Sequence, residues 1–498
     1  MDPFDYLETR GHFNINPGLE RMERLMRSFG SPQLSIPAVH IGGTNGKGST
    51  AAIVEAIMRE FPIRTGVYTS PHLLDITERL RIDGSDVDRD TLGRAMSRVL
   101  EVDTGEELTY FELVTGASML VMEEMGIDLN VCEVGMGGRW DATNVIEPQA
   151  IAITSISMDH MEHLGDDPVS ITLEKCGIIK PSTPVVVGEV CSLLDERERC
   201  LRTILDQCTH NGCPVILMSS RKGVERKKEL LSSYNIPDWR IASVECLSTL
   251  KGTTASFRVH GPDNDRIREP KFDLVDRVLQ GQFTIPLLGL HQAYNIGIGV
   301  SLSLLSLPFA LSHSKLQKGD TSALSNLISG CTEEMTSIYT CSGLRDMMNR
   351  GLKGIHLKGR MERIVRNGRE FYMDGGHNIE AARSVASTLG RLHPDRKCVL
   401  LLAMMGDKEV SEFLGNLDLD IDSVILTTLP YDRSMSTREL LQGVVRSGIG
   451  CVDIHIRQDI REAVALWEGM ITEEDIGLAT GSFYLYPHII SDAGGQNV

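Results

Sequence analysis

A glycine-rich loop between an apolar run and a helical segment constrains the fold of this chain most strongly. The run IPAV is followed by HIGGTNGKGST, residues 40–50, and then by AAIVEAIMRE. A strand, a loop with one lysine and a helix in this order form a cradle for phosphate in α/β proteins. The loop departs from the usual GxxxxGK[ST] pattern, because Gly48 separates Lys47 from Ser49. A Gly/Asn turn with an exposed lysine is the alternative interpretation.

The residues of this loop suit an anion. Glycines at positions 42, 43, 46 and 48 allow positive φ angles and close backbone approach, so N–H groups can point at a phosphate. Lys47 can neutralise terminal phosphates, and Ser49 or Thr50 can face a magnesium ion. The sequence therefore favours a phosphate loop over a plain turn.

Strand-like apolar runs alternate with helical segments over residues 35–220, as in a mostly parallel α/β sheet. The runs are IPAVHI, DLNVCEV, AIAITSI, TPVVVGEV and CPVILM. After HLKGRMERI the alternation restarts with EFYMDGG, KCVLLLAMMG, DSVILTTLP, CVDIHI and IGLATGSFYL. We therefore expect an α/β fold of two domains: residues 1–355, with the phosphate loop, and a smaller, Rossmann-like domain at 356–498.

The segments between these runs carry weaker patterns. TTASFRVHGPDNDRIREPKFDL, within residues 220–280, is expected to form hairpin strands. The uncharged stretch 292–314 contains Pro308, Asn295 and five serines, so it predicts a buried helix and loop rather than a membrane span. Residues 306–350 predict helices with an insertion.

Composition narrows the class of protein. The 498-residue chain has a net charge of −18, which argues against a general nucleic-acid or acidic-membrane binder, because phosphate backbones require a basic face. The 11 scattered cysteines include no CxxC pair, which favours a reduced compartment without a disulfide framework or zinc site. The acidic start MDPFDYLETRGHF lacks the pattern of a signal or transit peptide, so we expect a cytoplasmic protein.

Polar residues near strand ends form a second group of candidates. Glu133 is either a solvated strand end or a ligand for a hard cation at the carboxyl edge of the sheet. The glycines that follow it lack the GxGxxG spacing of a dinucleotide loop. His160 is either a loop or cap residue or a ligand, and Lys175 taken alone is a surface lysine. Phe111 taken alone is a core residue at the start of a helix.

Eleven short motifs that are typical of one protein family occur in order along the chain. They are GTNGKGS, TSPHL, LTYFE, EVGMGGRWDATN, DHMEHLG, EKCGIIK, LLGLHQAYN, GRMERI, DGGHN, GDKEV and GSF. Together they resemble the dihydrofolate synthase/folylpolyglutamate synthase family of the Mur ligase superfamily, over about residues 15–490. The resemblance implies that the intervening Gly48 belongs to the superfamily's own phosphate-loop pattern.

The resemblance implies roles for residues that match these motifs. The implied ATP-binding residues are Gly43, Thr44, Asn45, Gly46, Lys47, Gly48, Ser49, Thr50, Asn295, Arg360 and Asp374. The implied magnesium ligands are Ser70, Glu133, His160 and Lys175, the lysine being carbamylated. The implied catalytic set is Lys47, Lys175, His160, His377 and Ser482, the last two near the incoming glutamate. Thr109, Phe111 and Asp141 match residues that line a dihydropteroate pocket in the family's bacterial bifunctional type.

The implied reaction is ATP-driven amide formation. The carboxylate of a pteroate or folyl substrate attacks the γ-phosphate, and the amine of L-glutamate then displaces phosphate from the acyl phosphate. The expected cofactors are ATP, two Mg²⁺ ions and the carbamate on Lys175, with K⁺ as a further candidate. LTYFE and RWDATN favour the bifunctional type, which makes dihydrofolate and adds γ-glutamates to tetrahydrofolate. We expect small-molecule partners, no nucleic acid, no membrane and a monomer.

Two other functions stay open. A Mur-type ligase that adds an amino acid to a UDP-N-acetylmuramoyl acceptor shares the loop and the lysine, although no extra UDP-binding domain is recognisable before residue 35. A nucleotide-binding module without catalysis would have lost charged site residues, yet Lys47, Glu133, His160 and Lys175 are all present.

Overall fold

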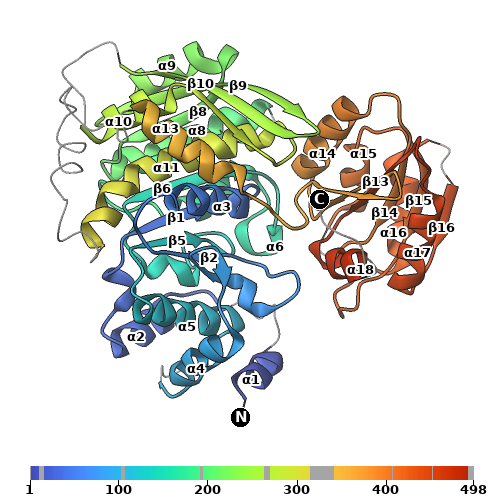
Figure 1. The fold of residues 1–498 in the computed structure, drawn as a ribbon, viewed down its shortest axis with the longest axis horizontal. Helices are drawn as coiled ribbons and strands as arrows, with labels where there is room; N and C mark the ends of the chain where they lie inside the picture. The colour runs from blue at the N-terminus through green and yellow to red at the C-terminus, as the bar shows by residue number, and fades with distance from the viewer. Residues whose placement is uncertain are drawn as a thin grey trace.

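The computed structural model describes residues 2–10, 16–102, 107–190, 194–262, 270–314, 341–406, 408–450 and 453–491. These residues form two β-sheets with helices packed against them, and the two units lie side by side (Figure 1). The larger sheet has 11 strands and the smaller has 6. The predicted α/β fold, with a mostly parallel first sheet and a second α/β unit, is confirmed. The domain boundary at 355/356 falls between helix and strand, and it remains our proposal.

The larger sheet is parallel in its centre and antiparallel at both margins. In spatial order its strands are β11 (Gln282–Ile285), β10 (Gly252–His260), β9 (Trp239–Thr249), β8 (Val215–Ser220), β7 (Val185–Val190), β6 (Ala150–Ile156), β1 (Ala38–Gly42), β5 (Leu129–Glu133), β2 (Thr65–Tyr68), β3 (Leu80–Ile82) and β4 (Ser85–Asp86). All pairs from β9 to β2 are parallel. The apolar runs of β1 and β5 are buried along their whole length, as expected for strands covered on both faces.

Strand β1 lies where the strand order of the sheet reverses. Its neighbours are β5 on one side and β6 on the other, and both pairs are parallel. In open α/β sheets, ligands bind outside the carboxyl ends of the strands at such a point. The loop after β1 and the ends of β5 and β6 therefore meet where a ligand site is expected.

Helices cover both faces of the larger sheet. They are α1 (Pro3–Arg10), α2 (Glu20–Ser28), α3 (Lys47–Met58), α4 (Arg89–Leu100), α5 (Tyr110–Glu124), α6 (Met161–Leu164), α7 (Pro168–Cys176), α8 (Leu194–His210), α9 (Val224–Ser232), α10 (Pro270–Leu279), α11 (His291–His313) and α13 (Cys341–Lys353). Helices α3, α10, α11 and α13 share one core cluster with the sheet. The opposite face carries α2, α4 and α5 at one end and α7, α8 and α9 at the other.

Helix α11 has the length and composition of a membrane span, but 78% of its apolar window is buried inside the protein. The prediction of a buried element at 292–314 is confirmed, whereas the predicted loop is wrong. The helix continues through Pro308 to His313, and it packs against α3 and α10 in the core. Packing of its apolar side chains outweighs the hydrogen bond that proline cannot donate.

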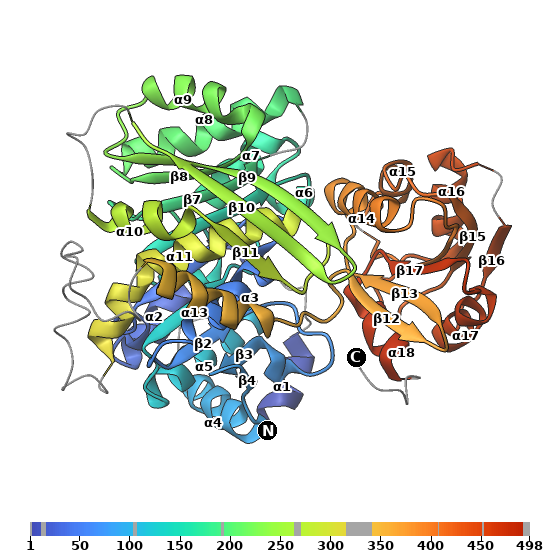
Figure 2. The same cartoon turned by 45° about the horizontal axis from the view of Figure 1, so that its top comes forward.

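The smaller sheet has the order β12 (Glu362–Arg366), β13 (Arg369–Asp374), β17 (Ile476–Thr480), β14 (Cys398–Leu402), β15 (Ile421–Leu426) and β16 (Asp453–Ile456). Only the β12–β13 pair is antiparallel. Its helices are α14 (Ile379–Leu392), α15 (Val410–Gly415), α16 (Thr437–Ser447), α17 (Ile460–Met470) and α18 (Tyr486–Ser491). Figure 2 shows the long hairpin β9–β10 extending toward α14 of this unit.

The predicted hairpin in the segment before residue 280 is only half right. TTASFRVH forms strand β10 as expected, but its hairpin partner is β9, which precedes the predicted segment, and PKFDL at 270–274 opens helix α10 rather than a strand. Its buried residues Phe272, Val275, Val278 and Leu279 recur at helical spacing, which explains the helix. The insertion predicted within 306–350 lies mostly at 315–340, outside the described residues.

Candidate active site

The glycine loop follows β1 and wraps over the end of β6. Gly43 and Gly46 have φ angles of 136° and 87°, which side-chain-bearing residues rarely adopt. A Cβ atom on Gly43 would lie only 2.0 Å from Thr154 Oγ1, and that hydroxyl donates to Asn45 O over 2.7 Å. Helix α3 begins at Lys47. The N–H groups of its first turn, which have no acceptor within the helix, therefore lie next to the loop, as in phosphate-binding proteins.

Two lysine amines converge on one carbonyl oxygen of the loop. Lys47 Nζ donates to the oxygens of Gly43 and Thr44, each over 3.1 Å. Lys175 Nζ, from α7, also donates to Gly43 O over 3.1 Å. Lys175 is only 4% exposed, so the interpretation as a surface lysine is wrong. Burial and the nearby charge of Lys47 lower the pKa of Lys175 to about 7.

Glu133 lies at the end of β5, beneath the start of α3. It is 2% exposed, so it is not a solvated strand end. Its Oε2 accepts a hydrogen bond from Ser70 N over 3.2 Å, and a Cβ on Gly48 would lie 3.5 Å from the same oxygen. Burial raises the pKa of Glu133, and the charges of Lys47 and Arg360 act in the opposite direction. The structure thus brings Ser70, Glu133 and the loop together.

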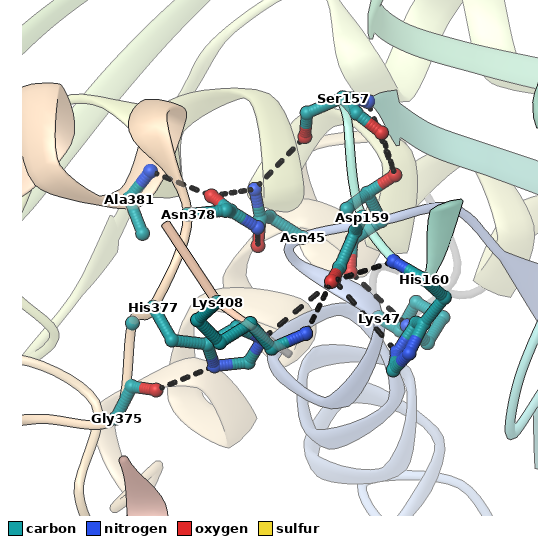
Figure 3. A network of polar contacts seen from close by, with 12 residues as sticks. Asn45, Lys47, Ser157, Asp159, His160, Gly375, His377, Asn378, Ala381 and Lys408 are labelled. Atoms are coloured by element: carbon teal, nitrogen blue, oxygen red, sulfur yellow. Dashed lines mark hydrogen bonds and ion pairs between the residues drawn. The ribbon is translucent and has the colours of Figure 1, made fainter. Parts of the chain in front are cut away.

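Sequence reasoning missed one carboxylate of this site, Asp159. Its oxygens receive Lys408 Nζ at 2.8 Å and the backbone N–H of His160 at 3.0 Å, and His377 Nε2 lies 3.6 Å away (Figure 3). Burial alone would raise the pKa of Asp159, but His377, His160 and Lys408 together hold it well below the usual range. Its place beside His160 in DHMEHLG was the available signal, but its other partners, His377 and Lys408, lie more than 200 residues further along the chain.

His160 is placed less favourably than the other candidate ligands. Its side chain is 41% exposed, and Nε2 lies 3.9 Å from Asp159. Among the described residues, no three His, Cys, Asp or Glu side chains are grouped so as to hold a metal ion. The ligand set implied by the resemblance contains only two such side chains, Glu133 and His160, and it depends on Ser70 and a carbamate for the rest.

The second unit adds charged groups from the carboxyl edge of its sheet. Asp374, at the end of β13, accepts backbone hydrogen bonds from Met361 at 2.9 Å and Gly376 at 2.8 Å. Arg360 stacks over the ring of Phe483, with its guanidinium carbon 4.2 Å from the ring centroid. Burial lowers the pKa of Arg360, and the carboxylate of Asp374 raises it. Of these groups, Arg360 acts electrostatically on Lys47 and Glu133 of the first unit.

Two further candidates have local hydrogen-bonding roles. Ser482 is 4% exposed, and its Oγ accepts from Tyr484 N over 3.2 Å. Asn295, in the first turn of α11, donates to Gln292 Oε1 over 2.9 Å. A Cβ on Gly46 would lie 2.6 Å from Asn295 Oδ1, so Asn295 lies directly against the phosphate loop.

The three candidate pterin-pocket residues lie on the same side of the first unit. Thr109 caps α5 in a capping box with Glu112. Phe111 is half-buried, 5.9 Å from the ring of Tyr68, and a Cβ on Gly135 would lie 2.5 Å from its ring. The glycine at 135 therefore makes room for the Phe111 ring over the loop that follows Glu133.

Asp141 anchors the other end of that loop. It is 7% exposed, and it accepts hydrogen bonds from Met136 N at 2.9 Å and Thr143 N at 3.0 Å. The Thr143 hydroxyl donates to the same carboxylate. Burial raises the pKa of Asp141, and these hydrogen bonds act against that shift. The residue thus shapes the loop that begins beside Phe111.

The fold and the site define a class: a phosphate-loop α/β protein whose loop is covered by a second α/β unit. Residues 41–302 match the Mur ligase middle domain, and residues 359–483 match the Mur ligase glutamate ligase domain. The chain belongs to the Mur ligase family. The resemblance found in its motifs is confirmed.

Individual relatives agree with this family. The chain is 29% identical to a probable bifunctional folylpolyglutamate synthase/dihydropteroate synthase of Haloferax volcanii, over 84% of this chain and 42% of that protein. It is 27% identical to the dihydrofolate synthase/folylpolyglutamate synthase of Mycobacterium tuberculosis, over 94% of this chain and 84% of that protein. The solved structure of Mycobacterium tuberculosis folylpolyglutamate synthase complexed with ADP superposes with a TM-score of 0.75 at 25% identity, covering 99% of this chain and 98% of the other.

Proposed function

We propose that the chain is an ATP-dependent ligase that joins L-glutamate to a pterin-bearing acid. Dihydropteroate and tetrahydrofolate are the two proposed acids, so the proposed enzyme is bifunctional. The convergence of Lys47, Lys175 and buried Glu133 on the phosphate loop is the observation that carries the proposal. The class of substrate in this proposal comes from relatives that are dihydrofolate synthases/folylpolyglutamate synthases.

The chain's own residues account for the chemistry. A carboxylate is a poor acyl donor, because its oxygen is a poor leaving group, and transfer of phosphate to it removes that obstacle. Lys47 and the backbone N–H groups at the start of α3 would offset the repulsion between the attacking carboxylate and the phosphates. Residues of the second unit, His377 and Ser482, would hold the incoming glutamate. The contact of the two units would exclude water from the acyl phosphate.

The residues present fit a nucleotide, and buried Glu133 beside Ser70 is the part of the site that fits a divalent cation. The positive φ angles of Gly43 and Gly46 keep the loop open to an anion, and the buried hydroxyl of Thr50, in the first turn of α3, has no hydrogen-bond partner. Mg²⁺ would be held by Ser70, Glu133, His160 and carbamylated Lys175, and it would neutralise phosphate charge. A pKa of about 7 leaves much of Lys175 as the neutral amine that reacts with carbon dioxide.

The test of this function is ADP release by the purified chain with ATP, Mg²⁺ and L-glutamate. We expect ADP when dihydropteroate or tetrahydrofolate is added, and none without an acid acceptor or with a UDP-N-acetylmuramoyl acceptor. Release only with the muramoyl acceptor would assign the chain to cell-wall synthesis. Release with no acid at all, or with none of the acceptors, would contradict the proposal.

Phe111→Ala is expected to reduce kcat/KM for dihydropteroate about tenfold or more, and to reduce it less for tetrahydrofolate. The half-buried ring beside Gly135 is the candidate platform for the pterin, and stacking on such a ring contributes about 1 kcal/mol or more. Tyr68→Phe removes only the hydroxyl of the neighbouring ring and serves as the control. Equal losses on both acids would argue against separate pterin-binding modes.

Other properties complete the proposal. We propose a cytoplasmic monomer with small-molecule substrates. The two expected Mg²⁺ ions and K⁺ are checked by the same ADP assay, run with each cation withheld in turn.

A further inference from the structure

Two sets of polar contacts join the second unit to the first, one at the phosphate loop and one just after strand β6. One is an amide pair between Asn45, in the loop, and Asn378, at the start of α14. The other is the ion pair between Asp159 and Lys408. Figure 3 shows both sets, with the ring of His377 next to Lys408.

The amide pair is reciprocal. Asn45 Nδ2 donates to Asn378 Oδ1 over 3.2 Å, and Asn378 Nδ2 donates to Asn45 Oδ1 over 3.2 Å. Asn378 Oδ1 also accepts from Ala381 N over 3.0 Å, so the same side chain caps α14. This pair of side chains therefore links the phosphate loop directly to the start of α14.

The ion pair is largely shielded from water. The side chains of Asp159 and Lys408 are 10% and 11% exposed, and their charged atoms lie 2.8 Å apart. Such a pair gains little net energy over an apolar contact, but leaving either charge alone in this place is costly. Its main effect is on geometry: it fixes where the chain segment carrying Lys408 lies relative to the end of β6.

His377 lies between these two contacts. It directly precedes Asn378, and its Nε2 faces Asp159 at 3.6 Å. Its Nδ1 lies 3.1 Å from Gly375 O. His377 thus adjoins Asn378, which is anchored to the first unit, and faces Asp159 of that unit, so a shift of α14 would carry His377 away from both.

We propose that Asn378 and Lys408 are positioning residues, which dock the second unit on the phosphate loop and thereby place His377 for capture of the amine. The inference rests on the proposed glutamate ligation. Neither residue needs to touch substrate: Asn378 acts through Asn45, and Lys408 acts through Asp159. Occupation of the phosphate loop and binding of the amine are coupled through these contacts.

The test compares variants of the 498-residue chain. Asn378→Ser keeps a capping oxygen for α14 but is too short to pair with Asn45. Lys408→Met removes the charge and keeps the length, and Lys408→Arg restores a cation. Lys397→Met is the matched control, because Lys397 pairs with Asp422 at 2.7 Å within the second unit and both side chains are well exposed.

We expect Asn378→Ser and Lys408→Met each to raise KM for glutamate about tenfold. A change of this size is typical when one of two interacting residues is removed. Lys408→Arg should recover most of the loss, and Lys397→Met should match the wild type. Combining Lys408→Met with Asp159→Asn should cost no more than the worse single change. Small-angle scattering with ADP and Mg²⁺ should give a larger radius of gyration for Asn378→Ser and Lys408→Met.

Unchanged KM and unchanged radius of gyration in both variants would overturn the proposal. A fall in kcat alone for Lys408→Met, without a change in KM or shape, would also overturn it, because Lys408 would then contact the reacting groups. The scattering arm does not depend on turnover. If the wild-type chain shows no glutamate-dependent ADP release, the proposed function is wrong. The radii of gyration would still decide whether Asn378 and Lys408 dock the second unit.

Discussion

Replacing Lys175 by methionine is expected to lower kcat by about 10³-fold without loss of the fold. The amine is buried on the phosphate loop, 3.1 Å from Gly43 O, where a carbamate would supply an anionic oxygen ligand. Carbamate formation joins the neutral amine to carbon dioxide and releases one proton. Depleting carbon dioxide should therefore lower the activity of the wild type, and adding bicarbonate should restore it. The variant should respond to neither.

The same change should not lower the melting temperature at pH 7. Folding lowers the pKa of Lys175 from 10.5 to about 7, so the unfolded chain binds more protons between these pH values. The contribution of Lys175 to stability therefore rises with pH across that window, and its burial costs stability at pH 7 and below. Methionine removes this cost at similar length.

A second buried lysine provides the control for Lys175. Lys227 also donates to a backbone carbonyl, that of Met218, and burial lowers its pKa to about 8, but it lies on α9, away from the loop. Lys227→Met should keep full activity. A Lys175→Met enzyme with normal turnover, or a wild type indifferent to carbon dioxide, would remove the carbamate from the mechanism.

Lys47→Met is expected to lower kcat/KM for ATP by about 10³-fold, the usual effect of removing a group aimed at transition-state charge. Its ammonium lies over the loop on the oxygens of Gly43 and Thr44. Without it, the repulsion between the phosphates and the attacking carboxylate is no longer offset at that point. The measurement is steady-state ADP release at varied ATP, with nucleotide affinity determined separately by calorimetry.

Lys180→Met is the matched control for this prediction. Lys180 also donates to a backbone oxygen, that of Asn144, over 3.0 Å, but outside the phosphate loop. It should change kcat/KM for ATP by less than about twofold. If both lysine variants lose activity equally, the effect at position 47 reflects general damage rather than phosphate chemistry.

The regular elements of the fold followed from local patterns in the sequence. Each apolar run proposed as a parallel strand between residues 35 and 220 became one, because strands buried on both faces require such runs. The stretch 292–314 was predicted to form a helix and a loop, but it is helical to His313, and α11 packs against α3 in spite of Pro308. PKFDL was mistaken for a strand because its period becomes visible only when Val275 and Val278 are included.

The sequence predicts the part of the candidate site that forms one local motif. It does not predict side chains whose contacts come from distant parts of the chain. The glycines and Lys47, placed between a strand and a helix, favour a phosphate loop even though their spacing departs from GxxxxGK[ST]. The burial of Lys175 depends on how α7 packs beneath the loop, which no local pattern reveals. The local sequence does not reveal the role of Asp159, because its side chain contacts His377 and Lys408, the latter 249 residues further along the chain.

The separation of the candidate residues between two sheets has a consequence for evolutionary divergence. Thr109, Phe111 and Asp141 lie around α5 and the loop after β5, whereas His377 and Ser482 follow strands of the other sheet. Substitution of a few side chains near α5 could therefore change which acid a descendant of this chain uses as its substrate. The machinery that activates the acid and the surface that receives the amine would be inherited unchanged.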